Sequence, residues 1–170
     1  MIGICCGSQV SPSIPAGEGK LYLCAIKDVH SNRIVGYSIS SRMKARLAVD
    51  ALDSAVARRA AAGDLVAGCV VHNDRGSQFR SRTFVHALSR HSMIGSMGCV
   101  GACGDTAAME SFLQKNVLDR QPWATRDDLR IAIVTWIERT YHRRRRQAAL
   151  GRLTPVEYEA IMTTPASQAA

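Results

Sequence analysis

The apolar run Leu65–Val71 limits the possible folds more than any other stretch of this sequence. Gly63 and Asp64 precede the run, and a polar segment that begins at His72 follows it. A short, nearly continuous apolar run between turn residues is typical of a strand that is buried on both faces. Such strands usually lie parallel to a neighbour that is reached through a helical crossover, so we expect a parallel strand in a helix-covered sheet.

The segments around this run predict the rest of an α/β domain. Leu21–Lys27 and Ile34–Ile39 have the composition of strands, and turn residues separate them. Met43–Ala62 has apolar residues at helical spacing. Further along, the sequence predicts a helix at Ser81–Arg90, a strand at Met93–Met97, a glycine-rich loop at 95–104 and helices that begin at Asp105, Thr125 and Thr154. This order of elements defines an α/β fold with a mixed sheet in a single domain.

Two of the later helices carry N-terminal capping signals. Thr125 is followed three residues later by Asp128, and Thr154 is followed in the same way by Glu157. Both pairs have the spacing of a capping box. We therefore expect a helix that runs from Thr125 toward Tyr141 and a last short helix that begins at Thr154.

The charge of the chain favours a polyanionic partner. Its 170 residues include 22 lysines and arginines against 14 acidic residues, which gives a formal net charge of +8. The segment from Arg139 to Arg152 holds six of the arginines and no acidic residue. Nucleic acid is the natural partner of such a cluster, and the alternative is a solvated helix end. No apolar run reaches the roughly 18–20 residues that span a bilayer, so we expect no membrane partner.

Two carboxylates are candidates for catalysis. Asp74 comes directly after the buried run, and the carboxyl ends of parallel strands are where α/β folds bind ligands. Glu110 lies near the start of the helix that follows the glycine-rich loop. From local sequence alone, Asp74 could equally cap a turn, and Glu110 could simply interact with the positive end of its helix.

Together with their neighbours, Asp74 and Glu110 resemble the catalytic core of insertion-sequence transposases of the retroviral-integrase-like type. These enzymes have the ribonuclease-H-like fold, so the resemblance implies a mixed β-sheet with flanking α-helices. The resemblance covers roughly residues 15–162. The matching stretches are Tyr22–Asp28, Ser31–Gly36, His72–Phe79, Gly104–Phe112, Trp136–Leu150 and Leu153–Glu157.

The resemblance further implies metal-dependent phosphoryl transfer on DNA. Asp74 matches the family's second carboxylate and Glu110 its third, so both are expected to be catalytic and to bind Mg²⁺ or Mn²⁺. Oxygen ligands suit these hard cations. The expected partners are transposon-end DNA, target DNA and intact copies in a homo-oligomer, in the bacterial cytoplasm at the nucleoid. The expected DNA-binding residues are Lys115, Arg139, Arg143, Arg144, Arg145 and Arg146.

The family's first carboxylate has no counterpart in this sequence. Counting back through the turn at 15–19 places it at Val10, and no acidic residue occurs before Glu18. Asp28 is a poor substitute, because a tight turn at 15–19 would set it opposite position 6, about 13 Å along the strand. We expect a structural role for Asp28 instead.

The missing carboxylate leaves three interpretations open. We divide the chain into an atypical segment 1–14, a catalytic core 15–162 and a tail 163–170, and interpret its start as truncated or degenerate. The chain is then an impaired transposase, a non-catalytic DNA-binding or subunit-interfering fragment, or an unstable relic. The third interpretation follows because a Ser/Pro-rich segment in place of the first strand would leave a sheet edge exposed.

Overall fold

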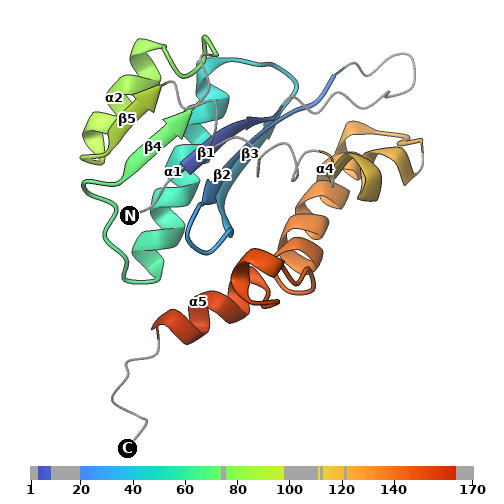
Figure 1. Ribbon diagram of the computed structural model, residues 1–170. Coiled ribbons are helices and arrows are strands. Elements are labelled where there is room, and N and C mark those ends of the chain that lie inside the picture. Colours follow the sequence, from blue (N-terminus) through green and yellow to red (C-terminus); the bar gives the residue numbers. More distant parts are fainter. Residues whose placement is uncertain are drawn as a thin grey trace, which may run out of the picture.

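A computed structural model describes residues 4–8, 20–73, 76–97, 111, 113–120 and 122–163. They form a five-stranded mixed sheet with helices on both faces (Figure 1). The strands are β1 (Ile4–Ser8), β2 (Tyr22–Asp28), β3 (Ile34–Ser40), β4 (Val70–Asn73) and β5 (Ile94–Met97), in the spatial order β3-β2-β1-β4-β5. The α/β fold and the mixed sheet that the sequence predicts are therefore confirmed.

The central strand of the sheet is β1. It pairs antiparallel with β2 on one side and parallel with β4 on the other, and β4 pairs parallel with β5. The expectation of an exposed sheet edge in place of the first strand is therefore wrong. The short sequence Ile4–Ser8 is enough, because an interior strand gains its hydrogen bonds from two neighbours at once.

The register of β1 also differs from the one expected from a tight turn. Asp28 lies opposite Ile4 rather than position 6, and Ser8 lies opposite Leu23. An irregularity between Cys6 and Ser8 shifts the pairing, which a simple count through the turn does not include.

The parallel strand predicted at Leu65–Val71 is confirmed, but it begins and ends later than predicted, at Val70–Asn73. β4 starts at Val70, and Leu65 is 88% exposed. Gly68 has a left-handed φ of 77°, and the Cys69 N–H donates to the Val66 carbonyl in a turn. The apolar character of 65–69 therefore belongs to a surface connection.

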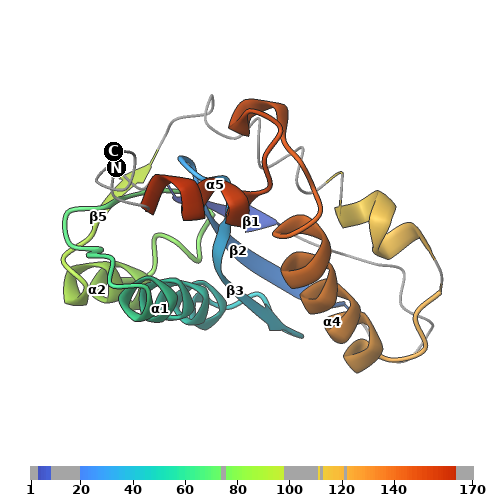
Figure 2. The same cartoon turned by 90° about the horizontal axis from the view of Figure 1, so that it is seen from below.

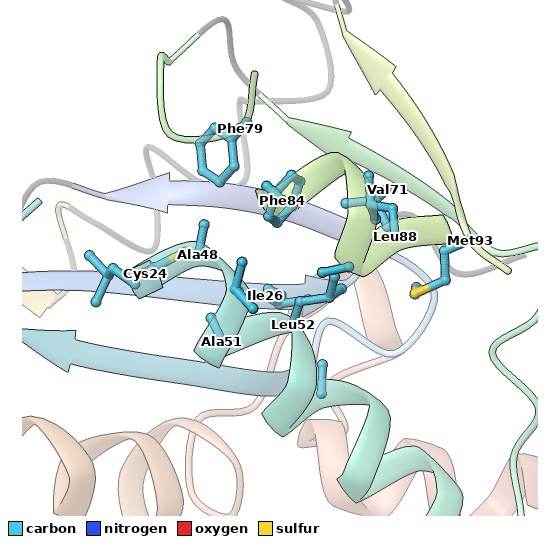
Figure 3. Close-up of a cluster of buried hydrophobic side chains, with 14 of the residues drawn as sticks. Cys24, Ile26, Ala48, Ala51, Leu52, Val71, Phe79, Phe84, Leu88 and Met93 are labelled. Carbon is cyan, nitrogen blue, oxygen red and sulfur yellow. The ribbon is translucent and has the colours of Figure 1, made fainter. Parts of the chain in front are cut away.

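One face of the sheet is covered by α1 (Ala45–Ala61) and α2 (Arg82–Arg90). Figure 3 shows the buried side chains where these helices meet the sheet, among them Ile26 of β2, Leu52 of α1 and Phe84 of α2. Gly36 of β3 lies so close to α1 that a Cβ there would be 2.4 Å from the Ala51 carbonyl oxygen. The absence of a side chain at this position lets the helix approach the sheet.

The other face is covered by residues 113–118 and by α4 (Arg126–Thr135), which continues as the π-helix η2 (Trp136–Tyr141). The helix predicted from Thr125 toward Tyr141 is confirmed as far as α4 and changes to wider turns beyond it. Thr125 caps the helix as predicted, since the Asp128 N–H donates to Thr125 Oγ1 at 3.1 Å, but the Asp128 carboxylate accepts from the Thr125 hydroxyl at 2.7 Å in place of the reciprocal backbone bond of a capping box. Of the helix predicted from Asp105, the described part is helical at 113–116 and ends in the short helix η1 (Leu118–Arg120).

The last helix, α5 (Pro155–Thr163), lies across one end of the sheet (Figure 2). A loop that contains the short helix η3 (Ala148–Leu150) precedes it. The second capping box is complete: the Thr154 N–H donates to Glu157 Oε2 at 2.9 Å, and the Glu157 N–H donates to Thr154 Oγ1 at 3.2 Å.

Candidate functional site

The carboxyl end of β4 is the place where the sequence predicts catalysis. Its last residue, Asn73, is buried and lies opposite Cys6 of β1 and Met97 of β5. Asp74 follows directly in the sequence. Both predicted catalytic residues, Asp74 and Glu110, lie outside the described residues, so their roles as catalytic groups and metal ligands stay predictions.

Two buried polar atoms mark this end of β4. Within the described part of the chain, Asn73 Oδ1 and His72 Nδ1 have no hydrogen-bond partner. Unpaired buried polar atoms are uncommon in native proteins, because each loses its hydration without compensation. Neither side chain is among the predicted site residues, and only their position at the end of a parallel strand could have pointed to them.

A metal ion at this site would depend on the predicted carboxylates. Among the residues with described positions, no group of three or more histidines, cysteines or acidic residues could hold an ion. The unpaired Asn73 Oδ1 is an oxygen donor at the strand end where Asp74 follows, so its chemistry suits a hard cation.

Asp28 has the structural role that the sequence predicts. It is 4% exposed, forms an ion pair with Arg59 of α1 and accepts a hydrogen bond from the His30 N–H at 2.8 Å. Its partner in β1 is Ile4, so it lies at the end of the sheet where β1 and β4 begin. Asp28 is therefore level with Val71 in the register, two residues or about 7 Å along the strands from Asn73.

A network of ions surrounds Asp28. Arg59 also contacts Asp64 and Glu159, and Glu159 of α5 accepts a hydrogen bond from Ser31 and pairs with Arg33. Burial opposes ionisation of Glu159, but the hydrogen bonds from Arg33 and Ser31 outweigh it and lower the pKa of its carboxyl. A cavity of about 740 Å³ lies beside this network, and its ionic groups already pair with each other.

The arginine-rich segment is anchored at this same end of the sheet. Tyr141 Oη donates to the Asn32 carbonyl at 2.9 Å, and His142 Nε2 accepts from the Ile34 N–H at 3.2 Å. Both contacts join the end of η2 to the β2–β3 turn. The arginines that follow His142 therefore lie away from the carboxyl end of β4, a position that the sequence does not predict.

The predicted DNA-binding residues are in different environments. Arg139, Arg143 and Arg144 are exposed, and their side chains have no hydrogen bond or ion pair with any described residue; Lys115 is exposed too. The Arg145 guanidinium lies 5.4 Å from the centre of the Tyr141 ring. Arg146 contacts Glu157 at 3.3 Å and the Arg152 carbonyl at 3.2 Å.

A buried histidine fixes the base of this segment. His142 is 1% exposed, and its Nδ1 lies 3.2 Å from Glu138 Oε2. Since Nε2 accepts from Ile34, Nδ1 carries the proton and donates it to Glu138. Burial lowers the pKa of His142 to about 4, although Glu138 opposes the shift.

Comparison with solved structures identifies the fold. The structure is similar to the catalytic core domain of HTLV-2 integrase, solved in complex with magnesium in a trimeric form, with a TM-score of 0.62 at 16% identity over 92% of this chain and 95% of that one. It is also similar to a chain of a simian T-cell lymphotropic virus intasome, with a TM-score of 0.59 at 12% identity over 97% of this chain and 55% of that one. The ribonuclease-H-like fold is therefore confirmed.

The sequence itself identifies the family. Residues 4–103 match the integrase core domain family, and the chain belongs to it. It is 37% identical over 145 residues to the transposase InsF of insertion sequence IS3A from Escherichia coli K12, which covers 84% of this chain and 49% of that protein. It is 34% identical over 146 residues to the transposase of IS629 from Shigella sonnei, over 84% and 47% of the two chains. The chain spans about half the length of these curated relatives.

None of the helices in the described ranges is long and apolar enough to cross a membrane.

Proposed function

We propose that this chain is the core of an insertion-sequence transposase that acts on DNA by phosphoryl transfer. The observation that carries the proposal is the position of β4, which lies between two parallel partners and ends one residue before Asp74. The integrase core match and the IS3 relatives support the same function. Such a protein would work in the cytoplasm, on the DNA of the nucleoid.

Asp74 and Glu110 are the residues that would hold Mg²⁺ or Mn²⁺. A bound ion would supply Lewis-acid stabilisation of the phosphate oxygens. The role of the protein would be to hold these carboxylates at the end of β4. Asn73 Oδ1, which has no hydrogen-bond partner among the described residues, is a further oxygen at the end of β4.

We propose that catalysis is impaired because the strand beside β4 carries no carboxylate. β1 has the sequence Ile-Cys-Cys-Gly-Ser, and Val10 stands where the family motif predicts the first acidic residue. Asp28 does not compensate, since it lies on β2, on the far side of β1 from β4, and is paired with Arg59. A site with one carboxylate missing loses part of the charge stabilisation that carries phosphoryl transfer.

We propose that DNA contacts the exposed arginines. Arg139, Arg143 and Arg144 are available for phosphate contacts, while Arg145 and Arg146 also shape the segment through Tyr141 and Glu157. Lys115, which is also exposed, would add a further phosphate contact. Such contacts fix position on the duplex without reading its sequence. The bound unit is expected to be a homo-oligomer on transposon ends and target DNA.

A cleavage assay tests both the function and the impairment. A labelled transposon end with Mn²⁺ is expected to show little or no product with the wild-type chain, whereas Val10→Asp should restore cleavage and joining. Adding Asp74→Asn to Val10→Asp should remove that activity again. Robust wild-type activity that Asp74→Asn abolishes would refute the impairment. No product from Val10→Asp, on a chain that still binds the DNA end, would count against the catalytic proposal.

The second candidate is a non-catalytic DNA-binding or subunit-interfering fragment. Arg139, Arg143 and Arg144 favour it, because they are exposed, pair with none of the described residues and need no active site to bind DNA. Mixing the chain with an active transposase of the same family distinguishes the two. A fragment that interferes should lower strand transfer in proportion to its concentration, and Arg143→Ala with Arg144→Ala should relieve competition for DNA.

A further inference from the structure

Arg152 has an unusual backbone conformation in the loop between η3 and α5. The φ angles of Gly151 and Arg152 are both 64°, and the Leu153 N–H donates to the Leu150 carbonyl at 3.2 Å. Two consecutive left-handed residues closed by this bond follow the pattern of a type I′ turn. Glycine is favoured at the two central positions because it has no Cβ for the backbone to crowd, and asparagine because its short side chain can form a local hydrogen bond. An arginine at position 152 therefore costs conformational energy that glycine would avoid.

The neighbouring contacts hold the backbone of Arg152 and leave its guanidinium uncommitted. Its N–H donates to the Gln147 carbonyl at 2.9 Å, and its own carbonyl accepts from Arg146 Nη1 at 3.2 Å. A bridge between Gln147 and Leu153 closes the base of the loop. The Arg152 side chain is exposed and makes no hydrogen bond or ion pair with the described residues. The packing of the described chain gives no reason for an arginine at this position.

The loop lies in a strongly basic stretch of the chain. No acidic residue occurs from Arg139 to Leu153. Glu157, which follows the loop, already pairs with Arg146. Strained residues with no role in packing are concentrated at binding sites. We propose that the turn presents Arg152 to a phosphate of duplex DNA, as a contact separate from the exposed arginines at 139, 143 and 144. This inference rests on the proposed DNA-binding function.

Replacing Arg152 by glycine removes the positive charge and keeps the backbone conformation of the turn. Glycine accepts the left-handed φ without strain, so Arg152→Gly should unfold at the same temperature as the wild type or higher. Binding to a fluorescein-labelled duplex of about 30 base pairs should weaken roughly three- to tenfold, and the slope of log affinity against log salt should fall by about 0.9. Arg152→Lys should keep most of the affinity, since a lysine also contacts phosphate.

The matched control is Arg46→Gln in α1. Arg46 has an exposed side chain and lies 13 residues from Arg59, so a rise of 1.5 Å per residue places it about 20 Å from the end of α1 that contacts α5. It should bind DNA nearly as the wild type does. If Arg152→Gly bound the duplex with the affinity and salt slope of the wild type, the contact by Arg152 would be refuted but the proposed DNA binding would not. The same holds if Arg152→Gly and Arg46→Gln lost equal DNA affinity. A wild-type chain that binds no duplex would overturn the proposed DNA binding together with the contact by Arg152.

Discussion

Gly36 is the residue at which the contact between sheet and helix is tightest. An added Cβ would lie 2.4 Å from the Ala51 carbonyl oxygen and 2.5 Å from the Ala55 nitrogen, and backbone atoms of a helix cannot rotate away. We expect Gly36→Ala to lower the free energy of unfolding by about 3 kcal/mol, measured by urea denaturation. Gly95→Ala is the control, because its nearest neighbour is the tip of the Leu88 side chain at 3.1 Å, and it should cost about 1 kcal/mol or less. Equal stability of Gly36→Ala and the wild type would contradict this packing.

His142 makes the stability of the protein depend on pH. Its pKa is about 4 in the folded chain, against 6.5 for an unperturbed histidine. Below pH 6.5 the unfolded chain therefore binds a proton that the folded chain excludes, so stability falls as the pH is lowered toward 4. We expect a loss of about 2 kcal/mol between pH 7 and pH 5, measured by urea denaturation at each pH. In His142→Gln most of this loss should be absent; the same pH profile in both proteins would contradict the buried neutral histidine.

At the scale of elements, the capping box of α5 gives a direct comparison with the N-terminal cap of α4. Thr154 is 2% exposed and exchanges two hydrogen bonds with Glu157, whereas the cap at Thr125 is exposed. We expect Thr154→Ala to cost about 1–2 kcal/mol and Thr125→Ala about 0.5–1 kcal/mol, measured by thermal unfolding. Thr154→Ser should recover most of the loss. A larger cost at Thr125 would mean that burial does not strengthen the cap.

Most elements could be predicted from the sequence, and the errors have physical causes. Helices and strands with regular apolar spacing, such as α1 and β2, lie within two or three residues of their predicted bounds. The start of β4 could not be predicted, because composition alone does not show that Leu65 faces solvent. The change from α4 to the π-helix η2 also leaves no clear signal, since Trp136, Ile137 and Tyr141 are buried in either case.

At the scale of the whole molecule, Arg59 connects three parts of the chain. Its guanidinium contacts Asp28 of β2, Asp64 after α1 and Glu159 of α5, and its side chain is 11% exposed. Burial opposes the charge of Arg59, but Glu159 and Asp28 outweigh it and raise the pKa of the guanidinium. Arg59→Leu leaves Asp28 buried without its cation, and we expect a loss of about 3–5 kcal/mol in urea denaturation. Adding Asp28→Asn to Arg59→Leu should recover part of that loss. If the stability losses of the two single substitutions simply added in the double variant, the ion pair would be contradicted.

The candidate site could be predicted only in part. The place of Asp74 after an apolar run predicts its role, and the parallel strand before it is confirmed. The location of the arginines at the opposite end of the sheet could not be predicted, since it depends on how Tyr141 and His142 contact the β2–β3 turn. The strained turn at Arg152 likewise depends on the hydrogen bonds that close the loop.

The central place of β1 also affects how the chain is made. Its parallel partner, β4, leaves the ribosome more than 60 residues later, which takes roughly 3–13 s at bacterial rates of translation. During that time β2 and β3 can already pair with β1, but the other edge of β1 has no neighbour. Nascent chains on one messenger RNA therefore present the same open edge to one another until β4 arrives.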